Sequence, residues 1–452
     1  MKMQTTEGRE AELKQDALDG LRMRLRGPLF LPGEAGHEES RSVWNAMIDR
    51  KPAVVARCRG VADVITCVQF ARDHDMLLSI KGGGHNIAGL AAADGALMLD
   101  MSLMRGVWVD SQGKVAHAQA GCLLGDVDRE TQVHGLASVL GFVSATGIAG
   151  LTLGGGFGYL TRRWGWTSDN VLGMNVVTAD ARLVRASSDE NADLFWGLRG
   201  GGGNFGVVTG IDYALYPVGP EVVGGVVAWP AGEAPKVLEL YRTLAEKAPP
   251  ELTLVALMRP APPAPWLPKD WHGKPIIALL ACCSGRPEDG EKLVAPIKAY
   301  SSPVGDVLVR RPYTQLQKIL DATQPKGPRL SRPQLSAGPL GGRGYAPRGP
   351  ALRRSQNARG PTIGSGAPAA ATLSRSPSPV TSTSAPPAIA SARIRRSDAS
   401  RTSNGIAGAS RTTSPWARRN ASTSSIRPGA IFSLRASTRR SSPSTVSPTT
   451  SW

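Results

Sequence analysis

The chain has 452 residues, enough for two or three domains with sizeable cores. Its formal net charge of +17 suggests nucleic-acid binding, but the distribution of this charge argues against it. Residues 329–452 alone hold 19 Arg, no Lys and one acid, Asp398, so residues 1–328 carry a net charge of −1. The N-terminus lacks a signal-peptide core and no apolar run approaches about 18 residues, so we expect a cytoplasmic protein, neither secreted nor membrane-spanning.

Cysteines and histidines indicate neither a disulfide framework nor a metal site. The cysteines are odd in number and lack metal-ligand spacing, which predicts reduced, mostly buried thiols at Cys58, Cys67, Cys122, Cys282 and Cys283. The histidines lack the close pairing that zinc sites use, so we predict no bound metal.

The N-terminal part predicts a β-α-β unit that ends in a glycine loop. Apolar residues recur at helical spacing across residues 9–26, and Gly27 ends that pattern. A strand at residues 52–58, a helix at residues 61–75 and a second strand follow, and the second strand runs directly into "GGGHN". Ligands of α/β sheets favour such carboxyl ends of strands, so we expect a binding site there.

Further along the chain, the pattern changes twice. Shorter strand-like runs lead to two more glycine blocks, at residues 141–170 and 198–219. From about residue 220, strand-like and helical runs alternate, which suggests a separate α+β domain. We therefore predict an N-terminal segment, a first domain, a partial second domain and a tail, at residues 1–46, 47–219, 220–328 and 329–452.

The third glycine block contains "GGGNFGVV", from Gly201, which matches both a dinucleotide motif and a kinase motif. A dinucleotide motif needs a strand before it and a helix after it, whereas here a helical run precedes and a strand-like run follows. The kinase hypothesis fails because no H-R-D or D-F-G accompanies the loop. Tight turns alone do not account for three long glycine blocks within about 140 residues.

A large anionic cofactor held by backbone accounts for these glycines better. Glycines let backbone N–H groups approach a pyrophosphate closely, so a nearly neutral domain can bind it without Lys or Arg. His85 lies among them in "SIKGGGHNIAG". On the residues alone, it is either a packed structural histidine or a functional one.

Four stretches, in this order, resemble the flavoprotein oxidases related to berberine bridge enzyme, which carry a PCMH-type (vanillyl-alcohol-oxidase type) FAD-binding domain. They are "RSVWNAMIDRKPAVVARCRGVADV", "SIKGGGHNIAG", "SATGIAGLTLGGGFGYLTRRWGWTSDN" and "DLFWGLRGGGGNFGVVT". The resemblance covers about residues 30–328. It implies an α+β fold, with an FAD-binding domain of two α/β subdomains and an α+β substrate domain whose antiparallel sheet is incomplete at the C-terminus.

The resemblance also implies covalent FAD. The family joins the histidine of this loop to the flavin 8α-methyl, which makes His85 the anchor, with Gly82, Gly83, Gly84 and Asn86 around the pyrophosphate. Further implied cofactor contacts are Gly89, Ser144, Thr146, Gly147, Gly150, Gly155, Asn170 and Val177. Some members add a cysteine link in a G-x-C-P motif, but Val143 stands at that position, so we expect the histidyl link alone.

In this family a substrate hydride moves to the flavin, a base takes the proton, and oxygen reoxidises the flavin with release of hydrogen peroxide. The resemblance thus implies a small-molecule alcohol or C–N substrate and oxygen as partners. The nearly neutral charge of residues 1–328 and the lack of a long apolar run predict neither a nucleic-acid nor a membrane partner. The family's base usually lies on the second-domain sheet or in a C-terminal segment, so no catalytic residue is assigned.

Residues 329–452 depart from the family. They are rich in Ser, Arg, Pro, Ala, Gly and Thr and show no periodicity, which predicts disorder. Three hypotheses fit this composition: a natural basic tail, an arginine-rich nucleic-acid arm and a shifted reading frame near residue 329. We prefer the shifted frame, because out-of-frame translation of GC-rich DNA gives this set of amino acids. The chain is then either an active FAD-linked oxidase or a catalytically impaired FAD-binding remnant.

Overall fold

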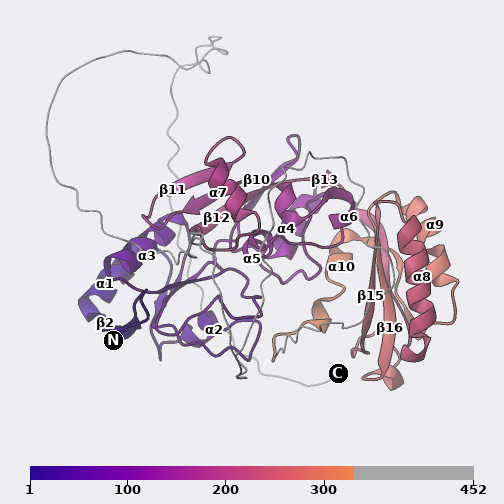
Figure 1. The fold of residues 1–452 in the computed structure, drawn as a ribbon, viewed down its shortest axis with the longest axis horizontal. Helices are drawn as coiled ribbons and strands as arrows, with labels where there is room; N and C mark the ends of the chain where they lie inside the picture. Colours follow the sequence, from indigo (N-terminus) through magenta and orange to yellow (C-terminus); the bar gives the residue numbers. More distant parts are fainter. Residues whose placement is uncertain (329–452) are drawn as a thin grey trace, which may run out of the picture. The chain divides into compact units, whose positions relative to one another are not determined.

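The computed structural model describes residues 1–328 (Figure 1). The predictions for residues 329–452, disorder and a shifted frame, lie outside the described residues. Within residues 1–328 the fold is α+β with mainly antiparallel sheets, which confirms the predicted class. A helix with the length and apolar character needed to span a bilayer is absent from this part of the chain. All five cysteines are free and buried, as predicted.

The N-terminal segment begins with a short hairpin rather than with the predicted long helix. Strands β1 (Lys2–Gln4) and β2 (Glu10–Glu12) pair antiparallel, and helix α1 (Gln15–Arg24) starts only after them. The apolar spacing predicts a helix from residue 9, but the residues at its start pair as a strand with β1 instead. Leu13, outside the helix, is buried all the same, which explains why it fits the apolar period.

The first sheet carries the predicted β-α-β unit. Its order is β3 (Leu29–Phe30), β4 (Val54–Arg57), β6 (Leu97–Asp100) and β5 (Leu78–Lys81). Helix α3 (Val61–Asp73) connects β4 to β5, and β6 lies between these two strands and runs parallel to both. A short helix, α2 (His37–Arg41), contacts β4 and β6. Because β5 ends at Lys81, the glycine loop starts at the carboxyl edge of this sheet.

A second sheet, antiparallel, completes the first half of the described chain. Its order is β11 (Leu183–Ser187), β10 (Val171–Val177), β12 (Val207–Ala214), β8 (Val115–Gln119) and β7 (Val107–Asp110). Residues of α1, α3 and both sheets share one apolar core. The connecting elements are α4 (Leu124–Gln132), β9 (Leu136–Ala137), α5 (Ile148–Leu153), α6 (Thr161–Trp164), the 3-10 turn η1 (Thr167–Asn170), α7 (Ala192–Leu198) and β13 (Tyr216–Pro217).

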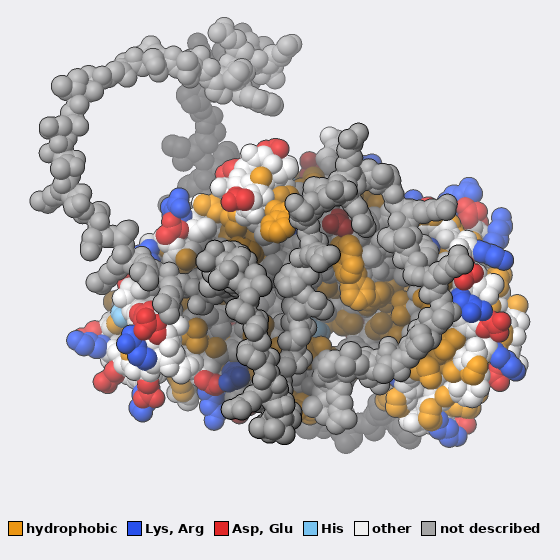
Figure 2. Space-filling view, viewed as in Figure 1, with side chains coloured by type: hydrophobic (Ala, Val, Ile, Leu, Met, Phe, Trp, Pro, Cys, Tyr) orange, Lys and Arg blue, Asp and Glu red, His pale blue; other side chains and the backbone are white. Residues whose placement is uncertain are grey.

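The third sheet belongs to the second half. Strands β15 (Leu252–Pro260), β16 (Pro275–Cys283) and β14 (Glu221–Pro230) are antiparallel neighbours, and β14 also pairs with β17 (Gly305–Asp306) and β18 (Val309–Pro312). Helices α8 (Ala234–Lys247) and α9 (Pro287–Lys298) cover one face, and charged side chains of both signs lie over their outer side (Figure 2). Two 3-10 turns, η2 (Ala231–Glu233) and η3 (Lys269–Trp271), join these elements.

The other face of this sheet packs toward the first half of the described chain. Residues of β14 and β16 share an apolar cluster there with Tyr159 and Leu160, which follow α5. Helix α10 (Tyr313–Gln317) belongs to the same cluster through Tyr313 and Leu316. The helix ends at Gln317, and the chain then turns into the 3-10 turn η4 (Asp321–Thr323). The last described residues thus run back toward the first half.

Candidate functional site: a glycine-lined cavity

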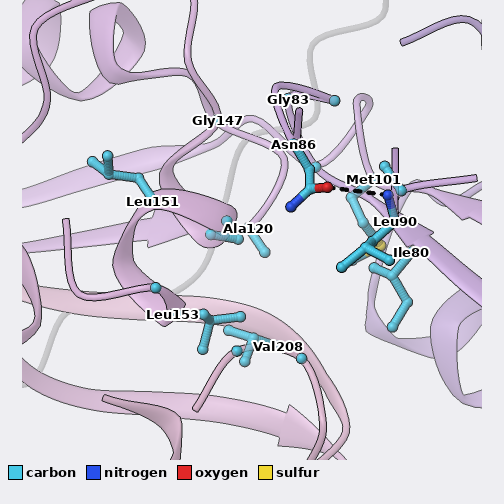
Figure 3. Close-up of a pocket in the computed structure, with 18 of the residues that line it drawn as sticks. Ile80, Gly83, Asn86, Leu90, Met101, Ala120, Gly147, Leu151, Leu153 and Val208 are labelled. Atoms are coloured by element: carbon cyan, nitrogen blue, oxygen red, sulfur yellow. Dashed lines mark hydrogen bonds between the residues drawn. The ribbon is translucent and has the colours of Figure 1, made fainter. Parts of the chain in front are cut away.

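A cavity of about 610 Å³ lies where the loop after β5, the start of α5 and the loop before β12 meet (Figure 3). Cofactor and small-molecule sites typically have volumes of this order. Nine of its 24 lining residues are glycines, so bare backbone forms much of the wall. These glycines are Gly82, Gly83, Gly84, Gly147, Gly150, Gly154, Gly202, Gly203 and Gly206.

Two of the glycine loops touch through their backbones. A Cβ atom on Gly83 would lie 2.3 Å from the Gly147 nitrogen, and one on Gly147 would lie 2.3 Å from the Gly83 nitrogen. The second loop is fixed from behind, because the Ile148 amide donates to the Cys122 carbonyl at 3.0 Å. A side chain at Gly83 or Gly147 would therefore push the two walls of the cavity apart.

His85 lies on the cavity wall, directly after the glycine run. Its imidazole stacks on the Trp44 indole, with ring centroids 5.0 Å apart and planes 18° from parallel. Burial lowers the pKa of His85, and the negative charge of Asp321 only partly opposes that effect. At neutral pH the ring is therefore uncharged, and one of its nitrogens carries a free lone pair.

The neighbours of His85 keep the loop in shape. The Gly84 carbonyl accepts a bond from the Trp44 amide at 3.0 Å, and its φ of +68° suits glycine. The Asn86 side chain also lines the cavity, but its Oδ1 accepts a bond from the Leu90 amide at 3.1 Å (Figure 3). Asn86 thus stabilises the turn in addition to the cofactor contact predicted for it.

The cavity brings together eight of the residues predicted from the sequence. They are Gly82, Gly83, Gly84, His85, Asn86, Thr146, Gly147 and Gly150. The other five, Gly89, Ser144, Gly155, Asn170 and Val177, are absent from its described lining. Their roles as cofactor contacts stay predictions.

Those five residues have other contacts. The Gly89 backbone lies so close to Ile48 that a Cβ there would approach its side chain to 2.5 Å. Gly155 has a φ of +99° in the loop after α5. Asn170 donates to the carbonyls of Trp164 and Trp166, and Val177 is fully buried at the end of β10. Ser144 hydrogen-bonds Asp321, 177 positions later in the chain.

The sequence interpretation attributed all three glycine blocks to a cofactor, but it named no individual residue of the third block as a contact. Gly202, Gly203, Asn204 and Gly206 line the cavity between α7 and β12. The helix-before-strand order correctly argued against a dinucleotide motif, yet the loop still faces the site. Its signal was the glycine density itself. Apolar side chains complete the wall, namely Leu78, Ile80, Leu90, Met101, Leu151, Leu153 and Val208 (Figure 3).

The cavity has the features that FAD requires. Among the described lining residues none is Lys, Arg, Asp or Glu, so a pyrophosphate there would depend on backbone N–H groups. Directly before the glycine loop, the Lys81 ammonium lies 3.4 Å from the buried Asp100 carboxylate. The apolar side chains suit flat aromatic rings. Glycine backbone and apolar surface in one cavity thus fit a cofactor that combines both chemistries.

Comparison with known proteins identifies the same cofactor. Residues 52–187 match the FAD binding domain family. The chain is 32% identical over 297 residues to (R)-6-hydroxynicotine oxidase of Paenarthrobacter nicotinovorans, which covers 65% of this chain and 63% of the relative. Glucooligosaccharide oxidase of Sarocladium strictum is 39% identical over 197 residues, 41% of this chain and 39% of that protein. The chain thus spans less than two thirds of either relative.

Solved structures show the same fold. The structure of 6-hydroxy-D-nicotine oxidase from Arthrobacter nicotinovorans superposes with a TM-score of 0.59 at 29% identity, over 65% of this chain and 63% of that one. A berberine-bridge-enzyme-like protein of Physcomitrella patens gives 0.58 at 24% identity, over 66% and 63%. Domain family, relatives and fold thus agree with a glycine-lined cavity suited to FAD: residues 52–187 match an FAD binding domain, and the chain is similar to FAD-linked oxidases over less than two thirds of their length.

Proposed function

We propose that this chain is an FAD-dependent oxidase that takes a hydride from a small alcohol or C–N substrate. FAD is attached through His85, and oxygen is the final acceptor, with release of hydrogen peroxide. Bound FAD supplies the hydride acceptor. The observation that carries the proposal is the place of His85, which stacks on Trp44 at the wall of a cavity built from glycine backbone.

Different groups of residues have different roles in this proposal. Backbone N–H groups of the glycine loops bind the pyrophosphate, and the apolar side chains exclude water from the rings. His85 supplies a nitrogen lone pair at the wall, because burial keeps its ring uncharged. Trp44 fixes the plane of that ring by stacking. The relatives named for hydroxynicotine and glucooligosaccharides support a substrate with an oxidisable C–N or C–O bond.

Turnover tests the proposal and separates it from the alternative, an FAD-binding remnant without catalytic competence. The full chain, loaded with FAD, is mixed anaerobically with 6-hydroxynicotine or with glucooligosaccharides. We expect one class to bleach the flavin absorbance and then to release hydrogen peroxide when air enters. A protein that binds FAD but is reduced by neither class would favour the remnant.

A single covalent link is the second expectation. Val143 has no thiol, and burial raises the pKa of Cys122 to about 12, so that thiol is a poor nucleophile. Tryptic digestion should therefore give one flavin-bearing peptide, residues 82–105, which contains His85. Mass spectrometry checks this directly. Flavin on the peptide of residues 115–129, which contains Cys122, would contradict the assignment.

A further inference from the structure

The last described part of the chain returns from the second half to the flavin site. We call residues 313–327 the return segment. Its Gln317 side-chain amide donates to the Gly141 carbonyl at 2.6 Å. Further along, Gly327 pairs with Asn45 in a parallel bridge and accepts a bond from the Ala46 amide at 3.0 Å. The return segment therefore joins the loop before α5 to the segment that precedes β4.

The segment around Trp44 in turn borders His85. The Trp44 indole stacks on the His85 ring, and its Nε1–H donates to the Gln324 carbonyl at 3.0 Å. The Asn45 side chain donates to the Ile87 carbonyl, also at 3.0 Å. The stacking partner of His85 is thus itself held by the return segment.

Asp321 lies in the middle of the return segment. Its carboxylate accepts a bond from the Ser144 amide at 2.8 Å and a second from the Ser144 hydroxyl. Within residues 1–328 no Lys or Arg forms an ion pair with it, so its charge is not neutralised by a neighbouring side chain. That charge acts on His85 and favours the protonated form of the ring.

Bond formation at His85 creates a positive charge. A neutral imidazole that bonds through one nitrogen, while the other keeps its hydrogen, becomes a cation until that proton leaves. The net change is one new N–C bond, loss of one hydrogen from the flavin methyl and one from the imidazole, and reduction of oxygen to hydrogen peroxide. A fixed negative charge near the ring stabilises the cationic stage.

We propose that Asp321 is a positioning residue for cofactor attachment. Held on Ser144, its carboxylate stabilises the cation that His85 becomes, while the rest of the return segment fixes the ring through Trp44. The inference rests on the histidyl link proposed above. Asp321 acts through His85 and does not itself need to touch the cofactor.

The test follows covalent incorporation in full-length protein prepared without flavin and then incubated with FAD. Asp321→Asn keeps the shape and removes the charge, so attachment should slow by at least about tenfold, a typical effect of removing a nearby opposite charge. Ser144→Ala, which keeps the charge and the amide bond, should slow it much less. In-gel flavin fluorescence after denaturation measures the rate, and absorbance measures total FAD bound.

The matched control is Asp306→Asn. Asp306 also accepts a backbone bond, from the Leu308 amide at 2.8 Å, but pairs with Lys298 in the second half. Attachment should proceed at the wild-type rate in this variant. As a second readout, NMR titration of the flavin-free proteins should show a lower His85 pKa in Asp321→Asn and no change in Asp306→Asn.

The outcomes separate the two proposals. If the wild-type protein binds only dissociable FAD, both the histidyl link and this inference are wrong. If the wild-type protein carries covalent flavin and Asp321→Asn attaches it at the same rate, only this inference is wrong and the histidyl link stands. If Asp321→Asn does not fold, the variant Asp321→Glu tests the proposal instead. Because glutamate keeps the charge, attachment should proceed within about threefold of the wild-type rate. If folded Asp321→Glu loses attachment while the His85 pKa is unchanged, the proposal is wrong.

Discussion

The variant His85→Ala should lose covalent flavin completely while it still binds FAD reversibly. The glycine loops proposed to bind the pyrophosphate should remain intact, since the substitution removes only the His85 side chain from the cavity wall. Loss of the imidazole should weaken reversible FAD binding by no more than about tenfold, or about 1.4 kcal/mol. Acid or detergent denaturation followed by in-gel fluorescence measures the link, and the released colour measures reversible binding.

His74→Ala is the matched control for that variant. His74 also stacks on an aromatic ring, that of Phe70, with centroids 4.2 Å apart, but it does not line the cavity. Its replacement should leave the covalent band at wild-type intensity. A yellow band that survives denaturation in His85→Ala would place the link on another residue.

The variant Gly83→Ala should lose FAD binding and also destabilise the flavin-free protein. Its methyl group would lie 2.3 Å from the Gly147 nitrogen and 2.6 Å from the Gly147 Cα, and backbone cannot move aside as a flexible side chain can. Overpacking typically costs about 1–3 kcal/mol of unfolding free energy. Because the displaced loops form the site, FAD affinity should fall by at least about 100-fold, or about 2.7 kcal/mol. Denaturant unfolding and FAD titration measure the two effects.

Gly150→Ala is the comparison for that variant. Gly150 lines the same cavity, but its Cβ would have no protein atom within 4 Å, and it lies inside helix α5. Alanine in a helix is favoured over glycine by about 0.8–1.0 kcal/mol, so the flavin-free protein should unfold at equal or higher denaturant concentration. Equal stability of Gly83→Ala and wild type would mean that the two loops are not in contact.

Local patterns in the sequence predicted the elements that carry the site. An apolar run followed at once by glycines predicts a strand that ends in a binding loop, and β5 ends at Lys81, just before Gly82. Helix α3 also follows its apolar spacing, with Val64 and Val68 buried. The anchor role proposed for His85 did not come from spacing. It came from the family resemblance, because a glycine-flanked histidine is equally compatible with a packed structural residue.

The parts that the sequence did not predict depend on contacts between distant residues. Ser144 and Asp321 are 177 positions apart, and nothing in the local pattern around either residue indicates the other. Glycine content also cannot distinguish a cavity wall from a turn: Gly154 lines the site, whereas Gly155 beside it does not and adopts a φ of +99°. The helical spacing after residue 9 was overridden by strand pairing with the chain terminus.

The indole that stacks on His85 depends on a carbonyl group 280 positions later in the chain. A ribosome adds about 5–20 residues per second, so at least about 14 seconds separate the synthesis of Trp44 from that of Gln324. During that interval the glycine loops exist without the contacts that fix the histidine. If attachment needs those contacts, as proposed above, the flavin can be joined to the chain only after residue 327 has been synthesised, so attachment is a late step in the maturation of the protein.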